Sequence, residues 1–343
     1  MIYFNSDYLE GAHPSIMVRL AETNMVQTVG YGEDEYCEAA REKIKTACQA
    51  PEADVHFLVG GTQTNTTVIA AILRPWQGVI SAVSGHINCH EAASVESSGH
   101  KILSLPGKDG KITAEQIEAC AKAYEQSGEA EYLTEPKMVY LSFPTEMGTL
   151  YSKKELAAIH ELCQKYGMYL FVDGARMGYG LASQENDLTL ADFAALCDVF
   201  YIGGTKCGAL FGEAVVITCD ALKRRFKAYM KQNGAVLAKG WLLGLQFCAL
   251  LENNAYFEAA KRAHAYAMRL KKAFAAKNIP FWVENSTNQQ FVILSEEQEK
   301  RLAQKYYFEK QETTERGTVV RFCTSWATTQ EEMDALCADI ERL

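Results

Sequence analysis

A chain of 343 residues, 48% hydrophobic and 22% charged, is long enough to bury a large core and to form a large and a smaller domain. Its formal net charge of -9 argues against nucleic acids and acidic membrane surfaces as partners, and no apolar run approaches the roughly 20 residues that span a bilayer. The N-terminus lacks the basic flank and apolar core of a signal peptide, and eleven scattered cysteines without a Cys-x-x-Cys pair are typical of reduced thiols, so we expect a cytoplasmic protein.

The first 245 residues alternate helical patterns with apolar runs. A polar segment, residues 1–15, leads into a short helix over 15–22, and Asp34 is placed to cap a helix that continues to about Ala50. Buried strands are expected at 55–59, 79–83, 101–105, 138–141, 168–172, 199–202 and 214–217, and helices at 64–73, 113–126, 153–166 and 188–196. Apolar strands that alternate with helices predict an α/β domain with a mostly parallel sheet covered on both faces.

The pattern changes at about residue 246. A long helical stretch over 246–274 is followed by strand-like runs at 281–283, 290–294 and 318–322, with helical stretches at 295–305 and 330–343. This mixture predicts a smaller α+β domain over residues 246–343, packed on a large domain of residues 1–245.

One lysine, Lys206, follows the apolar run at 199–202 and lies in a turn with glycines on both sides. It has no charge partner in its local sequence. Partial burial would lower the pKa of its amine and make the amine a usable nucleophile or Schiff-base former. Taken alone, the pattern also fits an ordinary surface lysine in a glycine-rich loop.

The stretch Gly60-Gly61-Thr62 joins a strand to the start of a helix. Free backbone N–H groups and the positive end of the helix favour a phosphate there, and Thr62 could add a hydroxyl donor. The alternative is a tight turn in which Thr62 or Thr64 caps the helix. The stretch lacks G-x-G-x-x-G spacing, so it only weakly supports a nicotinamide dinucleotide.

Asp173 comes at the carboxyl end of a buried strand, the edge of an open α/β sheet where ligands bind. A buried aspartate needs a cationic partner, which could be a protonated heterocyclic nitrogen or the nearby Arg176. A structural Asp173–Arg176 pair is therefore an open alternative.

Two histidines, a cysteine and a glutamate gather in residues 86–91. His86 and His90 would share a face of a helix, as metal ligands do, but no third ligand lies at a usual spacing, so we expect no metal. An imidazole lying flat on an aromatic ligand, oriented by Glu91, is a better use of His86; a capping or core histidine is the alternative. Arg321 ends a strand-like run and is a candidate carboxylate clamp, or a surface arginine.

Together these pieces specify one kind of ligand. A strand–turn–helix phosphate cradle, an end-of-strand aspartate and a reactive lysine 33 positions later (206 - 173 = 33) match the three needs of pyridoxal phosphate, which are an anchor, a partner for the pyridinium and a Schiff base.

Through nearly its whole length the sequence resembles the threonine aldolases of the aspartate-aminotransferase-like (fold type I) pyridoxal phosphate enzymes. The landmarks are Asn5-Ser6-Asp7, Tyr31-Gly32-Glu33-Asp34, Gly60-Gly61-Thr62, His86 with Glu91, Pro144-Thr145-Glu146, Asp173-Gly174-Ala175-Arg176, Gly203-Gly204-Thr205-Lys206 and Arg321.

The resemblance implies a role for each matching residue. Lys206 would carry the cofactor as a Schiff base, Asp173 would keep its ring nitrogen protonated, and His86 would stack on the ring. Gly61, Thr62 and Thr205 would contact the phosphate. Arg176 would lie near the phenolic oxygen and the substrate carboxylate, which Ser6 and Arg321 would grip.

Two departures from the family pattern concern the catalytic groups. Glu146 stands where many members have a histidine, and His90 stands where many have an aromatic residue. Of the residues near a further phosphate-binding arginine of some members, only Lys239 is basic. The Glu146 position and residues 203–213 resemble the low-specificity branch, which also takes phenylserine-type substrates. Members commonly place Tyr31 and the Lys239 region in a neighbouring subunit's site, so we expect a dimer or tetramer.

The resemblance implies cleavage of L-threonine or L-allo-threonine to glycine and an aldehyde. The base that removes the β-hydroxyl proton stays open among His86, His90, Glu146 and a bound water. Three alternatives also stay open: a related β-eliminating lyase or aminotransferase, a nicotinamide-dependent oxidoreductase that uses the Gly60-Gly61 turn, and a cofactor-binding partner protein without catalysis.

Overall fold

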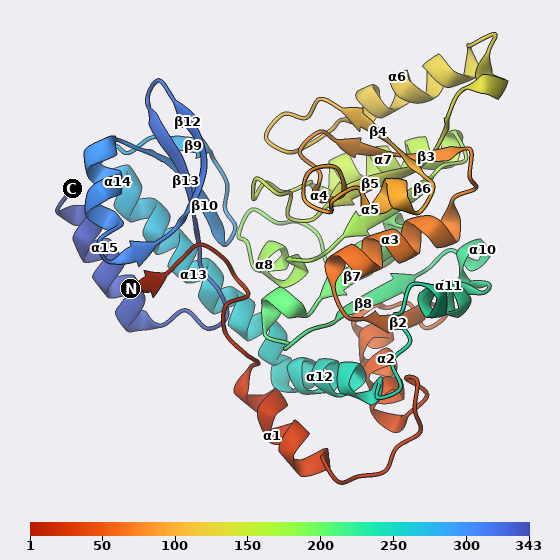
Figure 1. Cartoon of the computed structure of the whole chain (residues 1–343), viewed down its shortest axis with the longest axis horizontal. Helices are drawn as coiled ribbons and strands as arrows, with labels where there is room; N and C mark the ends of the chain where they lie inside the picture. The colour runs from red at the N-terminus through yellow and green to blue at the C-terminus, as the bar shows by residue number, and fades with distance from the viewer.

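The computed structural model describes residues 1–343, and its largest sheet has seven strands in the order β2-β8-β7-β6-β5-β3-β4 (Figure 1). Within this order, each neighbouring pair among the strands β7, β6, β5, β3 and β4 runs in parallel. Strand β8 runs antiparallel to both β7 and β2. The expected mostly parallel sheet is confirmed. Its strands are β2 (Asp54–Leu58), β3 (Gln77–Ala82), β4 (Lys101–Leu105), β5 (Glu135–Ser142), β6 (Tyr169–Asp173), β7 (Val199–Gly203) and β8 (Glu213–Ile217).

Helices cover both faces of this sheet, because successive side chains of each strand point to opposite sides and both sides are apolar. On β6, for example, Leu170 and Val172 enter a core of 44 residues, and Phe171 enters one of 19. The larger core is closed by α2 (Glu35–Cys48), α6 (Ala114–Glu125), α7 (Lys153–Lys165), α9 (Leu190–Leu196) and α12 (Trp241–Leu251). The smaller one is closed by α3 (Gly61–Ile72), α5 (Ser94–Ser97), α10 (Asp220–Lys223) and α11 (Phe226–Gln232).

The helices begin at the residues that their capping patterns indicate. The Asp34 carboxylate accepts a hydrogen bond of 2.8 Å from the backbone N–H of Cys37, which confirms the predicted cap of α2. Capping boxes begin α6, α7, α9, α14 (Glu296–Leu302) and α15 (Gln330–Glu341). Further short elements are α1 (Pro14–Thr23), α4 (His86–Cys89), α8 (Met177–Leu181), η1 (Ala130–Tyr132), η2 (Thr205–Cys207) and η3 (Glu252–Asn254).

The prediction of a single helix over residues 246–274 is wrong. The chain forms α12, which ends at Leu251, and α13 (Ala255–Ala276), with Asn253 and Asn254 between them at φ values of 52° and 58°. Asparagine tolerates this left-handed conformation better than most residues, so the break costs little. Gln246, at the predicted domain boundary, lies inside α12.

The C-terminal part is built on a four-stranded antiparallel sheet, β12-β13-β10-β9. Its strands are β9 (Phe281–Val283), β10 (Gln289–Leu294), β12 (Glu309–Thr314) and β13 (Gly317–Cys323), and α13, α14 and α15 pack around it. In Figure 1 these elements, in blue, stand beside the seven-stranded sheet. The strand β12 is polar along its length and was not expected from the sequence.

The N-terminal segment connects the two parts of the molecule. Strand β1 (Ile2–Tyr3) pairs in parallel with β11 (Tyr306–Tyr307), and Phe4 belongs to the C-terminal core (Figure 1). The chain then crosses to α1, which packs on α12. None of the helices has the length and hydrophobicity that a membrane span requires.

Candidate active site

The predicted site residues gather at the carboxyl ends of the parallel strands. Asp173 is the last residue of β6, Lys206 lies in the single turn η2 that follows β7, and His86 begins α4 after β3. The amino end of α3 follows β2 at the same edge. Since this edge is where ligands bind in open α/β sheets, the topology brings the cofactor residues to one place.

Asp173 is buried and satisfied entirely by neutral donors. The hydroxyl of Tyr140 and the amide of Asn65 donate to Oδ2 at 2.5 and 3.0 Å. The hydroxyl of Tyr201 and the N–H of Ala175 donate to Oδ1 at 2.5 and 3.0 Å. Burial opposes ionisation, but the charge of His86 and the tyrosine hydrogen bonds outweigh it and hold the Asp173 pKa below its ordinary value.

Arg176 does not pair with Asp173. Its Nε and Nη2 donate to the two carboxylate oxygens of Asp7 at 2.6 and 3.0 Å, and the Asp7 side chain is fully buried. The Asp173–Arg176 pair left open by the sequence is therefore wrong. Asp173 is an ionised carboxylate at a ligand-binding edge with no arginine or lysine bonded to it.

Lys206 is partly buried and lies among several charged groups. Burial lowers the pKa of its amine, as does the nearby Arg176, and the carboxylates of Asp7, Asp173 and Glu213 only partly offset this. The hydroxyl of Tyr179 donates to the Lys206 carbonyl at 2.6 Å and fixes the turn. A lowered amine pKa is what the sequence predicted for this lysine on partial burial.

Gly174 and Gly203 allow the backbones at the ends of β6 and β7 to pack closely. A Cβ on Gly203 would lie 2.3 Å from the carbonyl oxygen of Ala175, and one on Gly174 would lie 1.9 Å from that of Tyr201. The turn after β6 therefore touches the carboxyl end of β7 directly, and this contact brings the segments of Asp173 and Lys206 together.

Glu213 is a buried residue of the site that the sequence reasoning missed. Its Oε2 accepts a hydrogen bond of 3.0 Å from the N–H of Gly204, two residues before Lys206. Burial raises its pKa to about 8. A carboxylate at the head of the otherwise apolar run 213–217 was the signal that could have revealed it.

His86 belongs to the same polar network as Asp173. Its Nδ1 lies 2.7 Å from Oε1 of the buried Glu91, as predicted for an oriented imidazole. The amide of Asn65 donates both to Glu91, at 2.7 Å, and to Asp173, and so links the two carboxylates. Burial acts to lower the His86 pKa, but Glu91 and Asp173 together raise it above the ordinary value.

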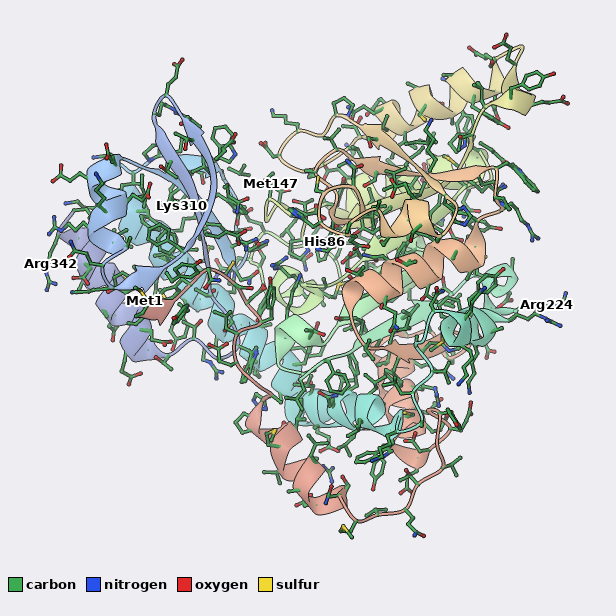
Figure 2. All side chains as sticks on the ribbon, viewed as in Figure 1. Met1, His86, Met147, Arg224, Lys310 and Arg342 are labelled. Atoms are coloured by element: carbon green, nitrogen blue, oxygen red, sulfur yellow. The ribbon has the colours of Figure 1, made fainter.

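Glu146 and His90 flank His86 on two sides. Oε1 of Glu146 accepts from the Ser142 hydroxyl at 2.5 Å and from the backbone N–H of His86 at 2.8 Å, and burial raises the pKa of this carboxyl. His90 is exposed, its ring centre lies 5.6 Å from that of His86, and partial burial and the His86 charge lower its pKa. In Figure 2, His86 lies on the side of the large sheet that faces the C-terminal strands.

The predicted phosphate cradle has free donors. Gly60 leaves α3 without a side-chain cap, so the N–H groups of Gly61 and Thr62 have no partner within the helix. Thr205 Oγ1 accepts from the N–H of Gly212 at 3.0 Å, and the Thr205 side chain also hydrogen-bonds Glu213, where it acts to lower the Glu213 pKa.

Two of the predicted carboxylate-binding residues lie on segments that meet between the sheets. Arg321 Nη2 donates to the carbonyl of Asn5 at 2.9 Å and forms an ion pair with Glu309. The neighbouring Ser6 hydroxyl is buried without a hydrogen-bond partner. An unpartnered buried hydroxyl indicates a polar ligand at this position.

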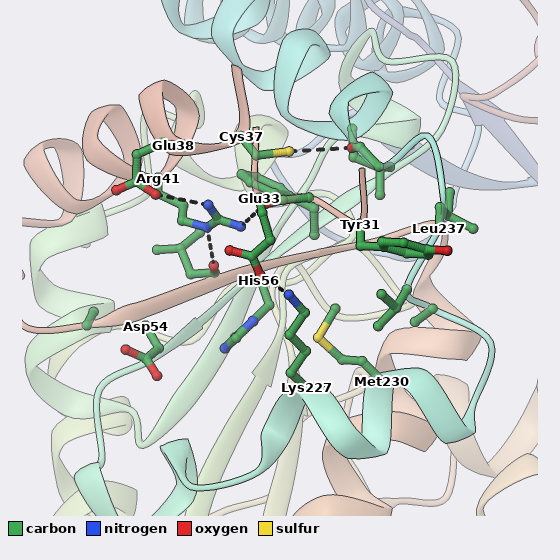
Figure 3. Close-up of a pocket in the computed structure, with 18 of the residues that line it drawn as sticks. Tyr31, Glu33, Cys37, Glu38, Arg41, Asp54, His56, Lys227, Met230 and Leu237 are labelled. Atoms are coloured by element: carbon green, nitrogen blue, oxygen red, sulfur yellow. Dashed lines mark hydrogen bonds and ion pairs between the residues drawn. The ribbon is translucent and has the colours of Figure 1, made fainter. Parts of the chain in front are cut away.

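Tyr31 and Lys239 lie apart from these groups, on the surface. The N–H of Tyr31 donates to the carbonyl of Ala238 at 3.2 Å, and both Tyr31 and Lys239 are exposed. Tyr31 lines a cavity of about 310 Å³ between α2 and α11, shown in Figure 3. None of the predicted cofactor residues lines this cavity, so it is separate from the predicted cofactor site.

The residues present fit pyridoxal phosphate. An ionised Asp173 without a cationic partner suits a protonated ring nitrogen, free N–H groups at α3 suit a phosphate, and Lys206 offers an amine of lowered pKa. All four acceptor positions of Asp173 are occupied within the chain. A charged ring nitrogen would replace a neutral donor, since charge-assisted hydrogen bonds are stronger.

We expect Asp7→Ala to lower the free energy of unfolding by about 3 to 5 kcal/mol, because it leaves the buried Arg176 guanidinium unpaired. Urea unfolding measures the change. Glu252→Ala, which breaks the exposed Arg19–Glu252 pair, serves as the control and should cost about 1 kcal/mol or less. Equal effects of the two changes would contradict the burial argument.

Glu91→Gln should lower the pKa of His86, because the hydrogen bond and the charge of Glu91 both raise it. NMR titration of the His86 ring measures this, with the exposed Glu96→Gln as the control. A raised histidine pKa gives stability that is fully present below 6.5 and lost as pH rises through the folded-state pKa. An unshifted His86 in Glu91→Gln would show that Glu91 does not hold the proton.

Comparison with known proteins confirms the resemblance to threonine aldolases. The low specificity L-threonine aldolase of Pseudomonas aeruginosa is 29% identical over 98% of this chain and 96% of its own length. A threonine aldolase structure from Leishmania major matches with a TM-score of 0.97 and 42% identity, covering 100% of this chain and 99% of that one.

The fold and the family follow from two further matches. A mutant aspartate aminotransferase of Thermus thermophilus, only 15% identical, matches 100% of this chain and 91% of its own with a TM-score of 0.72. The expected aspartate-aminotransferase-like fold is thereby confirmed. Residues 4–297 match the model of the beta-eliminating lyases, and the chain therefore belongs to the beta-eliminating lyase family.

Proposed function

We propose that this chain is a pyridoxal phosphate-dependent aldolase that cleaves L-threonine and L-allo-threonine to glycine and acetaldehyde, and that also takes phenylserine-type β-hydroxy amino acids. The observation that carries the proposal is the grouping of Lys206, the ionised Asp173 and the Glu91-bound His86 at one sheet edge. The full-length similarity to enzymes named as threonine aldolases supports the choice of reaction.

The cofactor would be held by residues from four strand ends. Lys206 would bind it covalently, Asp173 would hold its ring nitrogen, and His86 would lie on its ring. Gly61, Thr62 and Thr205 would bind the phosphate. When bound, pyridoxal phosphate supplies a ring that accepts the electrons of the broken Cα–Cβ bond.

Arg321 and Ser6 would hold the carboxylate of the substrate. Arg176 would contribute less to this, because its Nε and Nη2 are already bonded to the buried Asp7. Fixing the carboxylate would orient the substrate about its Cα and would favour cleavage of the Cα–Cβ bond over other reactions at Cα.

His90 is the side chain best suited to take the β-hydroxyl proton. The pKa of His86 is raised by Glu91 and Asp173, which disfavours its neutral, basic form. The pKa of His90 is lowered by partial burial and by the His86 charge, which favours its neutral form. Glu146 uses one carboxylate oxygen to hold Ser142 and the backbone of His86, which supports a positioning role for it.

The active enzyme would be a cytoplasmic homo-oligomer, a dimer or a tetramer. Eleven free thiols support the location. A group of exposed apolar side chains on α1 and in the loop after it supports a subunit contact. They are Met17, Val18, Met25, Val26 and Val29, with Tyr31 and Leu210 also exposed. In such a contact Tyr31 and Lys239 would complete the site of the neighbouring subunit.

Product analysis tests the reaction. We expect glycine and an aldehyde from L-threonine, L-allo-threonine and phenylserine, since the retro-aldol step breaks the Cα–Cβ bond. A keto acid with ammonia would instead indicate a β-eliminating lyase, and a keto acid without free ammonia would indicate an aminotransferase; either result would defeat the proposal. Lys206→Ala should lose both turnover and the absorbance of the bound cofactor. A nicotinamide enzyme would keep its cofactor in this variant, and a non-catalytic cofactor-binding protein would have no turnover to lose.

Matched variants test the base. His90→Asn should lower kcat by about 100- to 10,000-fold and remove the acid limb of the pH–rate profile, whose midpoint should lie below 6.5 because the His90 pKa is lowered. Glu146→Gln should cost less, since the amide still accepts a hydrogen bond. A larger loss in Glu146→Gln would assign the base to Glu146 instead.

A further inference from the structure

Two arginines at the site hold carboxylates of the chain itself, and the two pairs differ in burial. The Arg176 and Asp7 side chains are 12% and 0% exposed. The Arg321 and Glu309 side chains are 15% and 46% exposed. Glu309 can therefore leave its arginine for water, whereas Asp7 cannot do so without leaving a buried charge unpaired.

The hydrogen bonds of Arg321 show what its release requires. Nη2 donates both to the carbonyl of Asn5 and to Glu309, and Nη1 donates to Oε1 of Gln289 at 3.2 Å. Nε is buried without a partner. A guanidinium grips a carboxylate best through two parallel N–H groups, and three of the four Nη hydrogens are already used. When Glu309 leaves, Nη1 and Nη2 each have one hydrogen to donate to another carboxylate.

The fold holds Glu309 at this position. It is the first residue of β12 and lies directly opposite Arg321 on β13 in the antiparallel register. Directly opposed charges on neighbouring strands attract each other only weakly when exposed. Arg321 also donates a hydrogen bond to Asn5, which precedes the unpartnered Ser6 hydroxyl. The charges of Glu309, Arg321 and Lys206 all act on the pKa of His90. The pair therefore faces the substrate side of the site.

We propose that Glu309 competes with the substrate carboxylate for Arg321 and thereby lowers the affinity of the enzyme for α-amino acids. The inference rests on the proposed function, which assigns Arg321 to the substrate carboxylate. Binding exchanges one carboxylate for another on the same guanidinium, so part of the attraction of the substrate is offset. A ligand without a carboxylate does not take part in this exchange.

The test compares Glu309→Gln with wild type in the cofactor-loaded enzyme, using glycine and glycinamide as probes and the absorbance of the cofactor as the signal. We expect the dissociation constant for glycine to fall about two- to fivefold, which corresponds to about 0.4 to 1 kcal/mol. The value for glycinamide should stay the same. With threonine, the change should appear in KM rather than in kcat.

Glu312→Gln is the matched control, because Glu312 lies on the same strand, is exposed and faces Val319 rather than an arginine. It should leave both dissociation constants unchanged, and thermal unfolding of both variants checks that the hairpin is intact. A glycine dissociation constant that is unchanged or higher in Glu309→Gln would overturn the inference and make Glu309 a structural support of Arg321. The glycine titration requires no carbon–carbon cleavage, so failure of the proposed aldol reaction would be seen separately, in the product analysis.

Discussion

The site depends on one constraint, which is that a buried carboxylate at the end of β6 must remain ionised. Asp173 meets it with four neutral donors and the nearby positive charge of His86. Asn65 extends the network to Glu91, and Glu91 in turn orients His86. Removing any of these donors would leave a buried polar atom unsatisfied, so the side chains around Asp173 hold one another in place.

The backbone beneath this network is fixed by equally direct contacts. The turn after β6 and the carboxyl end of β7 approach so closely that only glycine fits at Gly174 and Gly203. Glu213 holds the turn from the other side through the N–H of Gly204. Lys206 is thus carried by a short, rigid turn, which suits a residue whose amine must stay beside several charged groups without pairing permanently with one of them.

Burial separates the roles of the two arginines. Arg176 is bonded to the fully buried Asp7 and so fixes the N-terminal segment against the large sheet. Arg321 is bonded to an exposed glutamate, and exchange of this partner costs little free energy. Asn5, Ser6 and Asp7 lie between the two arginines, which explains how one short segment can contribute both to stability and to a ligand site.

The sequence by itself determined the parallel sheet and the capped helices, and it placed Lys206, Asp173 and the Gly61-Thr62 turn at strand ends, because these features depend on local pattern and on the order of strands. It could not determine that Arg176 pairs with Asp7, that Glu213 supports the lysine turn or that Glu309 meets Arg321. These contacts join residues 169, 9 and 12 positions apart. Nor did it reveal the break at Asn253, because helical patterns flank the polar Glu252-Asn253-Asn254 stretch on both sides. Tertiary structure decided these features, because pairing between charges depends on distance and burial in space, and neither is encoded in local periodicity.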